Sequence, residues 1–213
     1  MNQTIINQIT KAGIVPVVKL DHAEDALPLA QALTDGGLPV AEVTFRTDAA
    51  AEAIRLMTEN CPQMLVGAGS LTSAAQAEAA MKAGAVFFVS AGFSGPVCAF
   101  AKEHSIPYLP GICTPTELML LVENGLSIAK FFPAEQMGGL AAMKAIAAAF
   151  PGMKFMPTGG VSPKNIRDYL AWDRIIACGG SWMVKASDIN NGNFEEITRL
   201  TKEAVAIVKA CRG

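Results

Sequence analysis

Short runs of β-branched and aromatic residues alternate eight times with Ala- and Leu-rich helical stretches along this chain of 213 residues. Successive strand-like runs start 21 to 26 residues apart, about the length of a strand, a helix and short loops. Eight such units predict a single-domain α/β fold over residues 1–213, a closed (β/α)8 TIM barrel. The strand-like runs begin at Ile14, Val40, Met64, Val86, Pro107, Ile128, Lys154 and Ile175.

A doubly wound open sheet is the competing fold. Nucleotide-binding sheets of that class carry a G-x-G-x-x-G motif directly after the first strand. Here the first strand ends in Lys-Leu-Asp-His at 19–22, without glycine. The nearest glycine motif, at 67–72, follows the third strand and lacks the third glycine. The sequence therefore favours the barrel and disfavours a nucleotide site.

Composition excludes several classes of function. The chain has 17 Lys and Arg against 19 Asp and Glu, a net charge of −2, so nothing draws it to nucleic acid or an anionic membrane. No apolar run is long enough to span a bilayer. A hydrophobic fraction of 51% and a mean hydropathy of +0.33 predict a large core and a subunit interface. Five scattered cysteines and no signal-peptide pattern predict a cytoplasmic protein with free thiols.

Lys130 is the first candidate for chemistry, because TIM-barrel sites lie at the carboxyl ends of the strands. Alternation along a strand puts Lys130 on one face with Phe132, and Phe131 on the other. Phe131 suits the layer between strands and helices, which turns Lys130 into the barrel mouth. Apolar surroundings favour the neutral amine, the form that attacks a ketone. The alternative is a strand-end lysine that extends its ammonium to solvent.

The second candidate is the segment 42–46 at the end of the second strand. The period of two puts Glu42 on the same face as Arg46. An inward carboxylate must be paired, or it serves as an acid/base group. Arg46 lies nearer the mouth and can hold a substrate carboxylate with two hydrogen bonds. The alternative is an internal Glu42–Arg46 pair that braces the barrel.

Two Gly-Gly pairs form the third feature. Thr158-Gly159-Gly160 and Gly179-Gly180-Ser181 stand at the ends of the last two strands, where barrels often bind phosphate through backbone N–H groups.

The histidines and Cys178 are predicted to be structural residues. His22 and His104 lack acidic partners at ligand spacing, so no metal site is expected. Cys178 falls in an apolar strand and is predicted to be core.

Together these segments resemble the class I 2-keto-3-deoxy-6-phosphogluconate (KDPG) and 4-hydroxy-2-oxoglutarate aldolases. The resemblance covers nearly the whole chain, and its motifs occur in family order at barrel-strand spacing. Its most specific pieces are EVTFRT (42–47), GAGS (67–70), PGICTPTE (110–117), KFFPAE (130–135), PTGG (157–160) and GGSW (179–182).

The resemblance implies roles for these residues. Lys130 corresponds to the Schiff-base lysine, Glu42 to the general acid/base, and Arg46 to the carboxylate-binding arginine. The resemblance also implies that the protein is a homotrimer and acts in the Entner–Doudoroff pathway. No cofactor is expected, since the lysine replaces a metal ion as the electron sink. The residues it assigns to substrate binding are Arg46, Ser70, Phe132, Thr158, Gly159, Gly160, Gly180 and Ser181.

Two positions depart from the family pattern. Ser70 stands where the family usually has Thr, and Ala91 where it usually has Pro. Neither residue is needed for Schiff-base chemistry, but both bear on affinity and substrate choice. Lys19, at the end of the first strand, has a surface role or reaches the anionic substrate.

The expected reaction is cleavage of KDPG to pyruvate and glyceraldehyde 3-phosphate, and of 4-hydroxy-2-oxoglutarate to pyruvate and glyoxylate. Three alternatives stay open at this point: a related pyruvate aldolase acting on a galactonate-derived substrate, a phospho-sugar isomerase or synthase in which no imine forms, and a non-catalytic barrel that binds phospho-metabolites.

Overall fold

The computed structural model describes residues 2–213, and each of the eight runs predicted as strands contains a strand. The predicted fifth strand is divided in two by Pro110, whose nitrogen carries no hydrogen for a ladder. The strands are β1 (Ile14–Val18), β2 (Val40–Thr44), β3 (Leu65–Gly69), β4 (Phe88–Val89), β5 (Tyr108–Leu109), β6 (Gly111–Ile112), β7 (Ile128–Phe131), β8 (Lys154–Pro157) and β9 (Cys178–Gly180).

The strands pair in parallel throughout, which confirms the α/β class. The larger sheet is a curled sheet of six strands in the order β5-β4-β3-β2-β1-β9. A second sheet has three strands in the order β6-β7-β8. Isolated bridges join Phe155 to Ile175 and Thr158 to Gly179, between the two sheets.

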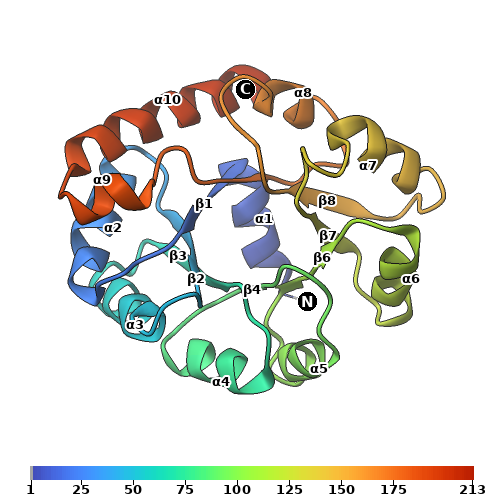
Figure 1. The fold of residues 1–213 in the computed structure, drawn as a ribbon, viewed down its shortest axis with the longest axis horizontal. Helices are drawn as coiled ribbons and strands as arrows, with labels where there is room; N and C mark the ends of the chain where they lie inside the picture. Colours follow the sequence, from blue (N-terminus) through green and yellow to red (C-terminus); the bar gives the residue numbers. More distant parts are fainter. Residues whose placement is uncertain (1) are drawn as a thin grey trace.

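Helices surround the strands. Figure 1 shows α2 to α10 as a ring outside the sheet, with α1 inside the outline of the ring. None of the helices within residues 2–213 has both the length and the apolar character of a bilayer-spanning segment. The helices are α1 (Gln3–Ala12), the 3-10 turn η1 (Ala23–Asp25), α2 (Ala26–Asp35), α3 (Ala50–Asn60), α4 (Ala74–Lys82), α5 (Gly95–Glu103), α6 (Pro115–Glu123), α7 (Gly139–Ala147), α8 (Ile166–Leu170), α9 (Ala186–Asn190) and α10 (Phe194–Arg212).

Side-chain caps fix where several helices begin. Ser73 accepts a hydrogen bond from the N–H of Gln76 at the start of α4, as its sequence position predicts. Thr114 caps α6 in the same way, and Glu117 returns the bond to complete a capping box. The sequence also predicts Pro163 in the first turn of a helix, but α8 begins only at Ile166, so this prediction is wrong.

Glu117 is expected to make the stability of α6 depend on pH. Burial opposes ionisation of this carboxyl, but hydrogen bonds from Cys113 and Thr114 outweigh burial and lower its pKa from the ordinary 4.5. A pKa lowered by folding stabilises the protein above the unfolded pKa, and this stabilisation disappears as pH falls through the folded pKa. Glu117→Ala should therefore lower the free energy of unfolding by about 1 kcal/mol at pH 7.

Urea denaturation across the acidic range measures this effect. The difference from wild type should shrink as pH falls below 4.5, whereas Glu123→Ala, at the exposed end of the same helix, should change stability little at any pH. A loss from Glu117→Ala that is equal at all pH values would contradict the assignment.

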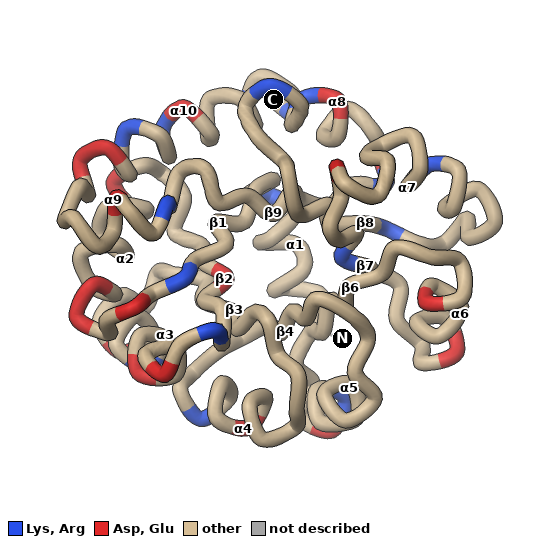
Figure 2. The backbone as a smooth tube through the Cα atoms, viewed as in Figure 1, with Lys and Arg blue, Asp and Glu red and all other residues tan. Residues whose placement is uncertain are grey.

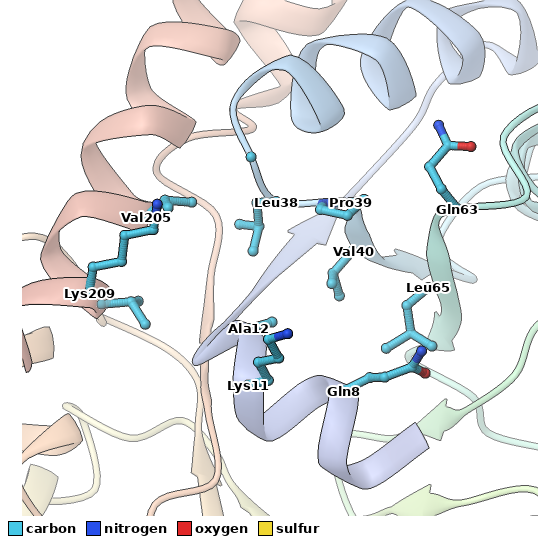
Figure 3. A pocket seen from close by; sticks show the side chains of 12 residues that line it. Gln8, Lys11, Ala12, Leu38, Pro39, Val40, Gln63, Leu65, Val205 and Lys209 are labelled. Carbon is cyan, nitrogen blue, oxygen red and sulfur yellow. The ribbon is translucent and has the colours of Figure 1, made fainter. Parts of the chain in front are cut away.

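A cavity of about 360 Å³ lies at the amino-terminal ends of β2 and β3, between α1 and α10. Its walls are apolar, with Leu38 and Val40 among them, and Lys11 and Lys209 lie at its edge (Figure 3). In α/β folds with parallel strands, ligands bind at the opposite, carboxyl-terminal ends of the strands. The residues predicted for the site lie at those other ends, so this cavity is not the candidate active site.

Candidate active site

The centre of the candidate site is an ion pair between β7 and β2. Nζ of Lys130 lies 3.2 Å from Oε1 of Glu42, although the two residues are 88 positions apart. Their side chains are buried, with exposed fractions of 4% and 0%. Figure 2 shows most charged segments on the outer helices, and an acidic segment of β2 and a basic segment of β7 inside the ring. The structure confirms that both side chains point inward.

The pairing also decides between the alternatives for each residue. Lys130 is buried rather than extended into solvent. Glu42 pairs with Lys130, and the salt bridges of residues 2–213 do not include a Glu42–Arg46 pair. The alternative interpretation, an internal ion pair between Glu42 and Arg46, is therefore wrong.

Gly69, the last residue of β3, makes room for the carboxylate. A Cβ at this position would lie 2.3 Å from Oε1 of Glu42 and 2.7 Å from its Cγ. Any side chain on Gly69 would displace Glu42 from Lys130. The glycine that ends the third strand is thus required by the ion pair beside it.

One carboxylate oxygen of Glu42 has no partner in the protein. Oε1 accepts the bond from Lys130, whereas Oε2 is buried without a hydrogen bond from any described residue. A buried carboxylate oxygen is costly unless it is bonded. Oε2 therefore keeps unused hydrogen-bonding capacity beside the lysine, while Oε1 holds Lys130.

Arg46 lies further along the same strand end. It is exposed, and its Nε donates a 3.0 Å hydrogen bond to Oγ of Ser70. Ser70 has a φ of +58°, a left-handed conformation that residues other than glycine rarely adopt. The hydroxyl at position 70 thus orients the guanidinium, and the planar group keeps other N–H donors for an anion.

A cavity of about 470 Å³ with both polar and apolar lining residues opens at the carboxyl ends of the strands. Lys130 adjoins it through Phe132, whose ring centroid is 5.3 Å from Nζ, and Glu42 adjoins it through Thr44 on the same face. Most of the predicted residues line this cavity, whereas Lys130, Glu42 and Ser70 do not. Those that line the cavity are Arg46, Phe132, Thr158, Gly159, Gly160, Gly180 and Ser181.

The loop after β8 has the backbone freedom expected of an anion cradle. Gly160 has a φ of +77°, and a Cβ there would lie 2.6 Å from the side chain of Glu135. The N–H groups of Ala134 and Glu135 bond the carbonyls of Thr158 and Gly159, which fixes this loop against β7. Oγ1 of Thr158 is buried without a partner among the described residues, so its hydroxyl is available to a bound molecule.

Two further cations line the same cavity. Nζ of Lys19 lies 2.5 Å from Oδ1 of Asp21, whose other oxygen accepts a hydrogen bond from Asn190. The bond from Asn190, followed by that from Lys19, lowers the pKa of Asp21. Lys185 was missed by sequence reasoning. Its position four residues after Ser181, in the segment that follows the last strand, was the available signal.

Ala91, where the family usually has proline, lies in a loop held by other means. Oγ of Ser90 lies 2.5 Å from the hydroxyl of Tyr108, and the same hydroxyl accepts a bond from the N–H of Ser94. Burial raises the pKa of Tyr108, which keeps its hydroxyl protonated. The backbone of 90–94 is thus anchored on β5 without the fixed φ of a proline.

The lining of this cavity among the described residues includes neither Cys178 nor the two histidines. Burial raises the pKa of the Cys178 thiol to about 12, so the thiol is neutral at physiological pH and its core assignment is confirmed. His104 stacks on Phe100 with ring centroids 4.2 Å apart. Within residues 2–213, His, Cys, Asp and Glu do not form a group that could hold a metal ion.

Known sequences resemble this chain over almost its whole length. The sequence profile described as KDPG and KHG aldolase matches residues 5–200. A 2-dehydro-3-deoxy-phosphogluconate aldolase of Treponema pallidum is 45% identical over 205 residues, 96% of this chain and 98% of the relative. The KHG/KDPG aldolase of Escherichia coli K12 is 45% identical over 197 residues, 92% of each chain.

Solved structures show the same relationship. The KDPG aldolase of Zymomonas mobilis with 3-phosphoglycerate has a TM-score of 0.91 and 39% identity, and covers 100% of both chains. That of Legionella pneumophila, in which pyruvate was captured at low pH as a covalent carbinolamine intermediate, has a TM-score of 0.89 and 38% identity. It covers 93% of this chain and 97% of that chain.

Proposed function

The chain belongs to the KDPG and KHG aldolase family, and from this premise we propose that it is a Schiff-base aldolase of the Entner–Doudoroff pathway. It cleaves KDPG to pyruvate and glyceraldehyde 3-phosphate. It also cleaves 4-hydroxy-2-oxoglutarate to pyruvate and glyoxylate, in keeping with the dual name of the Escherichia coli relative. The observation that carries the proposal is the buried 3.2 Å pair of Lys130 and Glu42 beside the cavity.

Lys130 supplies the nucleophile. Transfer of its proton to Glu42, 3.2 Å away, frees the lone pair on Nζ. The amine adds to the C2 ketone of the substrate to form a carbinolamine. Glu42 returns its proton to the carbinolamine hydroxyl, which leaves as water to give an iminium, and Glu42 is again a carboxylate. The captured carbinolamine in the Legionella pneumophila relative supports this step for the family.

Glu42 moves the protons that follow. Its carboxylate accepts the proton of the C4 hydroxyl, the C3–C4 bond breaks, and the bonding pair passes through C2 to the iminium nitrogen as an enamine. The aldehyde leaves, C3 is reprotonated, and water hydrolyses the imine to release pyruvate and the free lysine. The unpartnered Oε2 supports this role, because it is buried beside the lysine.

The two ends of the cavity hold the substrate. Arg46, oriented by Ser70, binds the C1 carboxylate with charge-assisted hydrogen bonds. At the other end, Thr158 and the loops containing Gly160 and Ser181 bind the 6-phosphate through hydroxyl and backbone N–H groups. Phe132 packs between these ends and the lysine.

The reaction is tested by incubating the protein with KDPG and measuring pyruvate and glyceraldehyde 3-phosphate separately. Equal amounts of both products are expected. Pyruvate from a galactonate-derived donor but not from KDPG would favour the related aldolase, and tight binding of KDPG without either product would favour the non-catalytic barrel.

For the architecture, we propose that the two parallel sheets are parts of one closed (β/α)8 barrel, a single domain over residues 1–213. Only Pro110 separates β5 from β6. On the other side, one bridge joins Phe155 of β8 to Ile175, just before β9, and a second joins Thr158, just after β8, to Gly179 of β9. One cluster of buried apolar residues runs from Ile6 to Val208, which supports a single domain.

A homotrimer is the proposed assembly, and its interface includes an exposed apolar face on α6. Met119 and Val122 are 53% and 51% exposed, and Leu120 beside them is 39% exposed. Such a patch is typical of a subunit contact.

The proposed location is the cytoplasm, which suits five free thiols and a phosphorylated substrate.

The substitution Val122→Asp is expected to convert the trimer to smaller species, because an interface cannot bury an unpaired carboxylate cheaply. Size-exclusion chromatography with light scattering measures the mass, and Glu123→Gln, at an exposed position on the same helix, is the control. A Val122→Asp protein that keeps the wild-type mass would place the interface elsewhere.

A further inference from the structure

The cavity beside Lys130 has a lining that is cationic on balance. Arg46, Lys19 and Lys185 line it, and its lining among the described residues includes neither Asp nor Glu. A cavity with one sign of charge attracts anions of the other sign. The three cations differ in how much of their charge is already offset, and this difference separates their roles.

Lys185 is the cation of the three that is least engaged with the protein. Arg46 is held by Ser70 at the carboxylate end. Lys19 forms a 2.5 Å ion pair with Asp21, which offsets its charge. Lys185 is exposed, and the salt bridges and side-chain hydrogen bonds found within residues 2–213 do not involve its ammonium group.

The backbone around Lys185 is fixed by its neighbours. Met183 and Val184, directly before it, are buried with exposed fractions of 0% and 2%. On the other side, α9 is anchored by buried Ile189 and by the hydrogen bond from Asn190 to Asp21. The backbone of Lys185 is therefore fixed at the wall of the cavity that Ser181 also lines.

We propose that Lys185 is a specificity-determining residue that selects donors carrying a terminal phosphate dianion. The inference rests on the proposed function and adds to it. The glycine loops supply neutral N–H donors to the phosphate end, whereas Lys185 supplies a positive charge that forms no salt bridge within residues 2–213 and is felt only at longer range by Glu196. A phosphate carries nearly two negative charges at pH 7, so this charge stabilises bound KDPG and has no partner on the same compound without phosphate.

The test compares kcat/KM for KDPG and for its unphosphorylated form, 2-keto-3-deoxygluconate, in matched variants. Lys185→Ala should lower kcat/KM for KDPG about tenfold, mainly through KM, and change the value for the unphosphorylated donor less than about twofold. Lys185→Arg should restore most of the loss. Lys202→Ala, an exposed lysine on α10 away from the cavity, should affect neither donor.

Two further readouts bear on the charge itself. The loss in Lys185→Ala should shrink at high ionic strength, because salt screens an exposed charge. The dissociation constant of inorganic phosphate, measured by calorimetry, should rise in the same variant. This second readout does not depend on turnover.

Several outcomes would overturn the proposal. An equal loss on both donors would indicate a structural role for Lys185, and an unchanged kcat/KM for KDPG with unchanged phosphate affinity would exclude any role in recognition. A wild-type protein that releases no pyruvate from either donor would instead overturn the proposed function, and the phosphate titration would still decide the role of Lys185.

Discussion

Lys130→Met is expected to lower kcat/KM for KDPG by at least about 10⁴-fold. Methionine keeps most of the side-chain volume but has no amine to add to the ketone, so the electron sink for C3–C4 cleavage is lost. The other lysines of the cavity do not replace it, because Lys19 is paired with Asp21 and Lys185 lies in the segment after β9. Steady-state pyruvate release measures the effect.

Folding must be separated from chemistry in this variant. Removing Lys130 leaves Glu42 buried without its partner, which costs about 3–5 kcal/mol when the carboxylate stays charged. The double variant Lys130→Met with Glu42→Gln removes that charge, and it should fold and remain inactive. Lys154→Met changes the other lysine in a strand, exposed at the start of β8, and should keep activity. Wild-type rates in a folded Lys130→Met protein would contradict the mechanism.

Glu42→Gln is expected to lower kcat about 10²- to 10⁴-fold while KM changes less than about threefold. Glutamine has nearly the same shape and can still hydrogen-bond Lys130, but it cannot accept the proton of the C4 hydroxyl. Substrate contacts at Arg46 and Thr158 are untouched, so binding should persist. Initial rates over a range of KDPG concentrations separate the two constants.

The control for this prediction is Glu203→Gln, which neutralises a carboxylate on the outer face of α10. It should leave both constants unchanged. A Glu42→Gln protein with normal kcat would assign the proton transfers to another group, and a large rise in KM with normal kcat would make Glu42 a binding residue only.

The sequence predicted the elements well because their signals are local. Alternation along single strands placed Lys130 and Glu42 on inward faces, and the cap residues Ser73 and Thr114 were readable from the chain alone. The division of the fifth strand at Pro110 was not predicted, although the residue was visible. Its effect depends on which neighbours the ladder would have joined, and that is set by the packing of other strands.

The partners within the site were harder to predict. Glu42 is four residues from Arg46 and 88 from Lys130, yet it pairs with the distant lysine. The distance between Glu42 and Lys130 is set by how the six-stranded and three-stranded sheets lie against each other, and no local pattern encodes it. The same holds for Lys185, which lines the cavity beside a segment whose Asn190 donates a hydrogen bond to Asp21 in the loop after β1.

Borohydride reduction in the presence of pyruvate tests the central claim most directly. Reduction converts an imine between pyruvate and a lysine into a stable amine, which intact-mass and peptide mass spectrometry then locate. The account predicts one pyruvyl group per chain, on Lys130, at the centre of the buried pair with Glu42. A folded protein that forms no adduct, or one modified at Lys19 or Lys185 instead, would contradict it.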